Sequence, residues 1–426
     1  MAYPKESATM YITRKIEAAV RRISRTFPVL MATGPRQSGK TTLLAHLSEG
    51  GRRYVSLDDP DDRLFAKTEP SAFLERYSPP VIIDEIQYAP EILPYIKMHA
   101  DRHRTNGAFW LAGSQMFHMM KNVSESLAGR VGIVNLFGLS NSEISGTLFD
   151  AFTADKGELT ERLDSARRMT LPEVFGRIHS GSMPRVYEQP GLDLDEYYSS
   201  YVQTYLSRDV RDLTQVADEL AFYRFLCIAA ARTGTLVNYE ALSREAEISA
   251  PTAKQWLSVL VSSGVVALIE PYHNNALKRV VKAPRMYFLD TGLAAHLTKW
   301  QNAAVLESGA MAGAFFETYA VSEIYKSFVN IGKRPPLYYY RDSNAKEIDL
   351  IILQDGTLFP IEIKKSANPA GAAKHFGVLA PVADDGNFDD MTRQLKMKIG
   401  PGCVVCLAND LRPIDRKNWC VPVWLI

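Results

Sequence analysis

The segment Gly34–Thr42, GPRQSGKTT, constrains this chain more than any other stretch. Two glycines separated by four residues and followed directly by Lys40 and Thr41 match the phosphate-binding P-loop pattern. The apolar run 27–31 before the segment predicts a short buried strand, and Leu43-Leu44-Ala45 after it predicts the start of a helix. A glycine-rich turn between strand and helix points backbone N–H groups at an anion, so the segment predicts a phosphate site.

Each residue type of this loop has a task in nucleotide binding. The glycines let the backbone approach phosphate oxygens, Lys40 would reach the β- and γ-phosphates, and the Thr41 hydroxyl would ligate Mg²⁺. An ordinary glycine-rich turn is the alternative, and the full set of diagnostic residues disfavours it. The sequence therefore predicts binding of ATP and Mg²⁺ through Gly34, Pro35, Arg36, Gln37, Ser38, Gly39, Lys40, Thr41 and Thr42.

A second strand supplies the carboxylates that a P-loop needs. Residues 79–85, PPVIIDE, form a short apolar run that ends in Asp84 and Glu85. We expect Asp84 to hold Mg²⁺ through its water shell and Glu85 to polarise the attacking water. A strand ending in Asp-Glu is weak evidence of a nucleotide site by itself. Here it follows a P-loop, and the two motifs together predict such a site.

Composition bounds the remaining possibilities. The 426 residues allow about three domains. With 46% hydrophobic and 23% charged residues and no apolar run near the roughly 18 residues of a membrane span, we expect a soluble, cytoplasmic protein without a membrane partner. A net charge of +1 confines any nucleic-acid surface to a local patch. Four cysteines suit a reducing cytosol, and Cys403 and Cys406 are interpreted as buried strand residues rather than zinc ligands.

Strands and helices alternate through residue 136, which predicts a parallel α/β sheet. The run Ala108–Gly113 predicts a strand that ends in Ser114 and Gln115. Ligands of such sheets bind at the carboxyl ends of the strands. Ser114 or Gln115 is therefore expected to contact the γ-phosphate or the attacking water.

These motifs resemble a prokaryotic AAA+ ATPase family whose C-terminal domain has no known function. The resemblance implies an AAA+ fold, ATP hydrolysis and ring-like homo-oligomers such as hexamers. It further implies a sensor role for Ser114 and Gln115, and an arginine-finger role across a subunit boundary for Arg130, for which a surface salt bridge is the alternative. The resemblance rests on GPRQSGKTTLL, YVSLDDP, VIIDEIQYAP, WLAGSQ, SLAGR, SGSMPRVYE, YLSRDVRDL, YFLDTGLAAHL, GAFFETYAVSEI, EIDLIIL and IEIKKS.

The middle of the chain changes character twice. Residues 141–217 are helical and polar, which suits the helical lid of an AAA+ module, and Arg208 or Arg211 could sense the nucleotide from it. Helices expected over 236–246 and 250–261, followed by a hairpin over 265–290, predict a winged helix-turn-helix. Its second helix offers Thr252, Lys254 and Gln255 to base edges, and its wing offers Lys278, Arg279 and Lys282 to phosphates. Packing against another protein is the alternative role.

The C-terminal part carries a second set of chemical residues. Glu317 lies in a helix expected over 312–328, Asp349 in a strand over 347–353, and Glu362 and Lys364 in a strand over 358–364. Residues two apart on a strand share a face, so Glu362 and Lys364 should point together. Asp349 and Glu362 could share a Mg²⁺ ion beside a scissile phosphate. The pattern resembles restriction-endonuclease-like nucleases; the alternative is a degenerate nuclease fold kept for packing or DNA binding.

The sequence thus predicts an α/β protein with four parts. These are an AAA+ P-loop core with a parallel sheet over 1–140, a helical lid over 141–217, a winged helix-turn-helix over 218–303 and a restriction-endonuclease-like α/β domain over 304–426. The expected function is ATP-driven remodelling or processing of DNA, with metal-dependent cleavage by the C-terminal domain. The alternatives are a nucleotide-dependent switch that assembles with a protein partner and cuts nothing, and a DNA-binding ATPase without cleavage.

Overall fold

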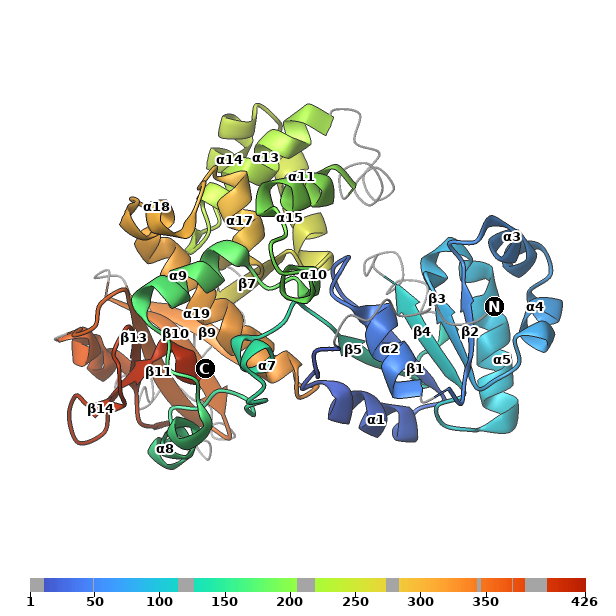
Figure 1. Cartoon of the computed structure of the whole chain (residues 1–426), viewed down its shortest axis with the longest axis horizontal. Coiled ribbons are helices and arrows are strands. Elements are labelled where there is room, and N and C mark those ends of the chain that lie inside the picture. Colours follow the sequence, from blue (N-terminus) through green and yellow to red (C-terminus); the bar gives the residue numbers. More distant parts are fainter. Residues whose placement is uncertain are drawn as a thin grey trace, which may run out of the picture.

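A computed structural model of the chain describes residues 11–48, 50–113, 126–204, 219–272, 283–342, 346–369, 371–379 and 397–426. Figure 1 shows an N-terminal α/β lobe beside a larger body that holds the rest of the chain. No helix among the described residues combines the length and the apolar character that crossing a membrane requires.

The N-terminal lobe is built on a five-stranded sheet in the order β2-β3-β4-β1-β5, in which every neighbouring pair is parallel. A parallel sheet is covered on both faces, which explains why its strands read as apolar runs. The parallel α/β sheet that we predicted is confirmed. Its strands are β1 (Val29–Thr33), β2 (Arg53–Ser56), β3 (Val81–Asp84), β4 (Phe109–Gly113) and β5 (Val131–Asn135).

Alternate residues of these strands pack against helices on opposite faces. Leu30 and Ala32 join a buried cluster with α1 and α2, whereas Val29 and Met31 join a second cluster with α3, α4 and α5. Helix α3 ends at Thr68 and a new helix, α4, starts at Pro70, because proline lacks the N–H that would continue the first helix. The helices are α1 (Glu17–Thr26), α2 (Lys40–Ser48), α3 (Pro60–Thr68), α4 (Pro70–Arg76) and α5 (Leu93–His103), with the 3₁₀ turns η1 (Ile86–Tyr88) and η2 (Pro90–Ile92).

The segment predicted as a lid is helical, and much of it packs on the body. Phe175 and Tyr198 belong to one continuous hydrophobic cluster that also includes Phe316 and Trp424 near the C-terminus. The helices of this segment are α7 (Asn141–Ser145), α8 (Lys156–Ser165), α9 (Leu171–Ser180), α10 (Pro184–Glu188) and α11 (Leu194–Thr204). Of these, α8, α9 and α11 contribute buried residues to the cluster and so share a core with the rest of the body. The boundary predicted at 217/218 lies outside the described residues.

The next elements follow the order helix, turn, helix, hairpin that a winged helix-turn-helix requires. The side chains of Asn238 and Ser249 accept backbone hydrogen bonds at the starts of the two predicted helices. The first of these begins at Tyr239, three residues later than predicted, because Thr235 and Leu236 form a short strand. The elements are α13 (Glu219–Ala231), β6 (Thr235–Leu236), α14 (Tyr239–Ala246), α15 (Ala250–Ser262), β7 (Val266–Pro271) and β8 (Arg285–Phe288).

The hairpin continues directly into the sheet of the C-terminal part. Strand β7 pairs with β9, so one sheet runs in the order β14-β15-β13-β11-β10-β9-β7-β8-β6, with β12 beside β11. The boundary predicted at 303/304 therefore crosses a shared sheet. The remaining strands are β9 (Leu337–Arg341), β10 (Glu347–Gln354), β11 (Thr357–Lys364), β12 (Lys398–Ile399), β13 (Cys403–Cys406), β14 (Arg412–Pro413) and β15 (Trp419–Pro422). The helices are α17 (Thr291–Leu297), α18 (Ala303–Ser308) and α19 (Ala312–Val329), with the 3₁₀ segments η4 (Ala372–Leu379) and η5 (Val423–Leu425).

A buried ion pair joins the lobe to the body. Lys326 of α19, 1% exposed, donates to the carbonyl of Leu139 at 2.8 Å and pairs with Glu323. The Glu323 carboxylate accepts a hydrogen bond of 2.7 Å from the backbone N–H of Asn141. Through these two hydrogen bonds, the buried pair on α19 holds the segment that follows β5.

Candidate active sites

The loop between β1 and α2 has a backbone that only glycine tolerates at its first position. Gly34 has φ of 141°, and a Cβ atom there would lie 2.0 Å from the carbonyl oxygen of Leu136. Gly39 adopts φ of 88°, which also favours glycine. The two glycines of the motif therefore shape the loop as the sequence predicts.

Lys40 closes the loop from inside. Its ammonium donates to the carbonyl of Gly34 at 3.0 Å and to that of Pro35 at 2.7 Å, and the residue is only 8% exposed. The buried Ser38 hydroxyl has no hydrogen-bond partner within the described part of the chain. A buried cation and an unsatisfied hydroxyl at a helix N-terminus fit a phosphate chain, so the loop suits a nucleotide.

The P-loop and the acidic strand meet as predicted, although β4 lies between β1 and β3. The Thr41 hydroxyl donates to Asp84 Oδ2 at 2.7 Å, and the Tyr54 hydroxyl donates to the same oxygen at 3.1 Å. Asp84 is 6% exposed at the end of β3. A hydroxyl and a carboxylate in contact are the donor set that holds nucleotide-bound Mg²⁺ in P-loop proteins.

Glu85 is held in a specific orientation. Its φ of 52° is unusual for a residue other than glycine, and such strain concentrates at functional positions. Gln87 donates a hydrogen bond to its carboxylate. Burial raises the pKa of Glu85 and the Asp84 carboxylate adds to that rise, while Gln87, Arg36 and Lys40 oppose it. A raised carboxylate pKa suits a group that must accept a proton from water.

Arg14 is a residue of this site that the sequence did not reveal. It is 4% exposed and donates to the carbonyls of Ser38 at 3.0 Å and Phe137 at 2.8 Å. Its Nε also lies 3.1 Å from Oε1 of the buried Glu143. Arg14 thereby ties the P-loop to the chain that leaves β5. Arg14 lies in a segment in which basic and apolar residues alternate, so the sequence did not indicate that its side chain is buried.

Helices of the body also touch the P-loop. The Tyr197 hydroxyl of α11 donates to the side-chain oxygen of Gln37 at 2.7 Å, and Pro184 of α10 lies beside Gly39. Burial raises the pKa of Tyr197, whereas the positive charge of Arg185, an exposed residue of α10, acts to lower it. Arg185 is thus a described arginine near the loop that sequence reasoning missed. Arg208 and Arg211, which we predicted as nucleotide sensors, lie outside the described residues, as do Ser114 and Gln115.

Arg130 lies at the surface and pairs with Asp101 of α5. Its Nη2 is 3.2 Å from Asp101 Oδ2, and its Nη1 donates to the carbonyl of Ala128 at 2.7 Å. Arg130 precedes β5, whose first residue pairs with Val29 at the start of β1. The length of a five-residue strand, about 17 Å, separates that edge from the P-loop. Arg130 can therefore reach a nucleotide only in another subunit, or serve as a salt bridge.

The C-terminal residues predicted from the sequence also come together. Lys364 Nζ lies 2.7 Å from Glu362 Oε2 and 3.2 Å from Asp349 Oδ2. The backbone N–H of Ile363 donates to the same Asp349 oxygen at 2.9 Å. Burial and the neighbouring Asp349 raise the pKa of Glu362 to about 8. Burial opposes ionisation of Asp349, but a hydrogen bond with Glu362 and the charge of Lys364 leave its pKa lowered.

Glu317 joins this group through residues that the sequence did not single out. The Tyr287 hydroxyl donates to Glu317 Oε1 at 2.7 Å, and Arg285 Nη1 lies 3.3 Å from the same atom. Burial and the charge of Asp349 raise the pKa of Glu317 to about 7. Arg285 also lies 2.8 Å from Glu347 and 3.7 Å from Asp349. We call Arg285, Glu317, Glu347, Asp349, Glu362 and Lys364 the carboxylate cluster.

The carboxylate cluster is not arranged as a ready metal site. Within the described ranges, no three His, Cys, Asp or Glu side chains are placed to hold one ion together. Lys364 and Arg285 stand among the carboxylates instead. The carboxylates could bind a divalent cation only after Lys364 or Arg285 has moved away from them.

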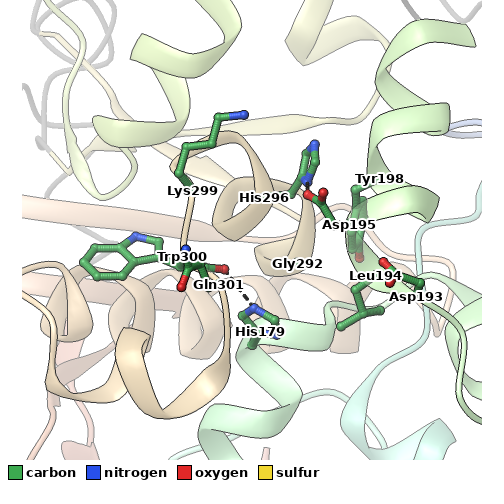
Figure 2. Close-up of a pocket in the computed structure, with 10 residues that line it drawn as sticks. All are labelled: His179, Asp193, Leu194, Asp195, Tyr198, Gly292, His296, Lys299, Trp300 and Gln301. Carbon is green, nitrogen blue, oxygen red and sulfur yellow. Dashed lines mark hydrogen bonds and ion pairs between the residues drawn. The ribbon is translucent and has the colours of Figure 1, made fainter.

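A separate cavity of about 610 Å³ lies between α9, α11 and α17 (Figure 2). His296 Nδ1 is 2.9 Å from Asp195 Oδ1, and His179 Nε2 is 3.0 Å from the carbonyl oxygen of Trp300. Burial lowers the pKa of His296 although Asp195 opposes that effect. No motif in the sequence pointed to this cavity, because its lining comes from three helices that are distant in the sequence and from the residues that flank α11 and α17.

Comparisons with known proteins agree with this geometry for the N-terminal lobe. Residues 26–145 match the AAA domain family, whereas residues 173–304 and 312–426 match two domains of unknown function, DUF8612 and DUF4143. Uncharacterized proteins of Mycobacterium tuberculosis and Mycobacterium bovis are each 28% identical to the chain over 363 residues, 85% of this chain and 76% of theirs.

Solved structures give weaker likenesses. A Walker-type ATPase of Pyrococcus abyssi is 13% identical with a TM-score of 0.43, over 70% of this chain and 99% of its own. The RuvB Holliday junction branch migration motor of Thermotoga maritima is 19% identical with a TM-score of 0.28, over 59% of this chain and 87% of its own.

The parallel sheet, the loop geometry and the AAA domain match over residues 26–145 together indicate that the N-terminal lobe is a nucleotide-dependent P-loop ATPase module of the AAA type. The body, in contrast, matches families whose descriptions state no function.

Proposed function

We propose that this protein hydrolyses ATP with Mg²⁺ and uses the energy to remodel or process DNA. The contact of 2.7 Å between Thr41 and Asp84 is the observation that supports ATP hydrolysis, because it joins the P-loop to the acidic strand. Glu85 follows directly and is positioned by Gln87. The test is ATP turnover by the purified protein with and without Mg²⁺, and with and without DNA: a DNA motor should hydrolyse faster when DNA is added.

The residues of the loop divide the work of hydrolysis. The loop backbone and Lys40 would hold the phosphates, while Thr41 and Asp84 would hold Mg²⁺, which neutralises phosphate charge when bound. Glu85 would orient a water molecule and draw its proton. Tyr197, through Gln37, connects the loop to α11, so the loop and the body can respond to each other.

DNA is proposed as a partner because of the helix–turn–helix–hairpin order and its basic side chains. We expect affinity for DNA to fall steeply with salt, since each phosphate contact releases counterions. Lys278, Arg279 and Lys282 lie outside the described residues, so their role rests on the sequence. Changing all three to alanine should flatten that dependence by about one logarithmic unit of slope for each side chain that had bound a phosphate. Fluorescence anisotropy at several salt concentrations measures the slope. If the affinity for DNA depends neither on salt nor on these substitutions, a protein-docking role for the helix-turn-helix region is favoured.

Metal-dependent cleavage by the carboxylate cluster is the second part of the proposal. The protein should cut DNA with Mg²⁺ or Mn²⁺ but not with EDTA, because the clustered carboxylates need a cation to approach a phosphate. Asp349→Ala or Lys364→Ala should abolish cutting and leave ATP turnover nearly unchanged, since the two sites lie in separate parts of the chain. Gel assays should include single-stranded, duplex and branched DNA, each with and without ATP. Failure to cut any of these substrates would leave a nuclease-like fold without the chemistry.

A nucleotide-dependent switch is the second candidate function. The observation that favours it is the pairing of the cluster's carboxylates with Arg285 and Lys364 rather than with an open cation site. In this function the ATP state would control assembly with a protein partner or with other copies of the chain. ATP turnover should then be slow and indifferent to DNA.

A further inference from the structure

Arg285 is a cation buried at the centre of the carboxylate cluster. It is 7% exposed, yet it comes from β8, in the hairpin that precedes the C-terminal strands. Its backbone is held on both sides, because Arg285 pairs with Leu236 of β6 and with Ile269 of β7. The side chain is therefore delivered to the cluster by a fixed strand.

The guanidinium reaches carboxylates on two other elements. It lies 3.3 Å from Glu317 of α19, and 2.8 and 3.7 Å from Glu347 and Asp349 of β10. It also lies over the ring of Tyr339, 5.3 Å from the centroid. A planar guanidinium offers donors in several directions, which a point charge cannot do, so Arg285 holds these elements together.

Both oxygens of Asp349 are already engaged. Oδ1 faces Arg285 at 3.7 Å, and Oδ2 receives Lys364 at 3.2 Å and the N–H of Ile363 at 2.9 Å. The Lys364 side chain is 44% exposed and can leave towards solvent, whereas the Arg285 side chain is 8% exposed. Of the two cations, Arg285 is the one that the fold fixes in place.

The carboxylate cluster already contains its own cations. Its four carboxylates, Glu317, Glu347, Asp349 and Glu362, face Arg285 and Lys364, with Arg341 at the rim, 3.6 Å from Glu347. Arg285 supplies part of the positive charge that a divalent ion would bring.

We propose that Arg285 is an internal counter-ion that competes with a divalent cation for the carboxylate cluster. While the guanidinium contacts Glu317, Glu347 and Asp349, it keeps the cluster's affinity for metal low. Because β8 holds Arg285 in place while Lys364 can leave towards solvent, an ion that enters the cluster must share the carboxylates with the guanidinium. The competition rests on the proposed metal site and does not require that DNA be cut.

The test compares Mn²⁺ binding to the full-length protein without nucleotide, with free Mn²⁺ measured by its electron paramagnetic resonance signal. Arg285→Gln should bind Mn²⁺ about tenfold or more tightly than the wild type. Arg341→Gln removes a charge from the rim and should change the affinity much less. The double variant R285Q/D349N should lose the gain, which places the bound ion in the cluster.

Equal Mn²⁺ affinity in folded wild-type and R285Q protein would overturn the proposal. So would a gain of the same size in R341Q, because the effect would then be general charge and not the guanidinium. If R285Q does not fold, Arg285→Lys keeps the charge but loses the planar donors, and should bind Mn²⁺ more tightly than the wild type; unchanged affinity overturns the proposal. If R285Q binds Mn²⁺ more tightly but the protein does not cleave DNA, the counter-ion role of Arg285 is supported and only the proposed nuclease function is contradicted.

Discussion

Lys40→Ala should lower the affinity for ATP by at least about 10²-fold, because a charged hydrogen bond contributes about 1.5–3 kcal/mol and Lys40 would make several to the phosphates. The ammonium now sits inside the loop on the carbonyls of Gly34 and Pro35. Binding of a fluorescent ATP analogue measures the loss. Lys67→Ala, which removes an exposed lysine of α3, is the matched control and should retain far more affinity. Wild-type binding by Lys40→Ala would remove the P-loop assignment.

Glu85→Gln separates binding from turnover at the same site. The variant should bind ATP and stall, because Asp84 and Thr41 remain in contact while the water loses its base. In the wild type, turnover should fall as pH decreases through the raised pKa of Glu85, since the protonated carboxyl cannot accept a proton. This fall should begin at a higher pH than for an ordinary glutamate. Turnover by Glu85→Gln at the wild-type rate would show that another group activates the water.

The parts of the ATP site that could be predicted are those encoded locally. Gly34, Lys40, Thr41, Asp84 and Glu85 lie in two short motifs, and each motif fixes its own strand end. Parallel strands bring their carboxyl ends to one edge, so the meeting of Thr41 with Asp84 follows from the α/β alternation. The same reasoning placed Asp349, Glu362 and Lys364 together, because neighbouring strands and alternate residues define one face.

The parts that could not be predicted depend on contacts between distant segments. Arg14 reaches Ser38 and Glu143, and Tyr197 reaches Gln37 across 160 positions of the sequence. Arg285 looked like the first residue of an ordinary hairpin strand, and only the pairing of β7 with β9 joins that hairpin to the carboxylate sheet. Buried arginines and tyrosines give no periodic signal, since a charged residue in a sequence usually indicates a solvated face.

Arg130 has two alternative roles, that of an arginine finger and that of a surface salt bridge, and its place in the fold bears directly on the choice between them. We propose that it completes the nucleotide site of a neighbouring subunit in a homo-oligomeric ring. Its position at the edge of the sheet opposite the P-loop excludes a role at its own nucleotide. Asp101 holds the guanidinium at the surface. The salt bridge alone would contribute little, because exposed pairs are typically worth about 0–1 kcal/mol.

Arg130→Ala should therefore lower ATP turnover by about 10³-fold or more while ATP binding is retained, since an arginine finger stabilises charge that develops only in the transition state. Asp101→Ala is the control, because it breaks the same salt bridge but leaves the guanidinium; it should keep turnover within a few fold. Mixing Arg130→Ala with Lys40→Ala subunits should restore activity, because an intact P-loop in one subunit meets an intact Arg130 in the next. Turnover is measured across mixing ratios, with subunit exchange verified by fluorescence energy transfer. Equal losses in Asp101→Ala and Arg130→Ala, or exchange without rescue, would reduce Arg130 to a surface ion pair.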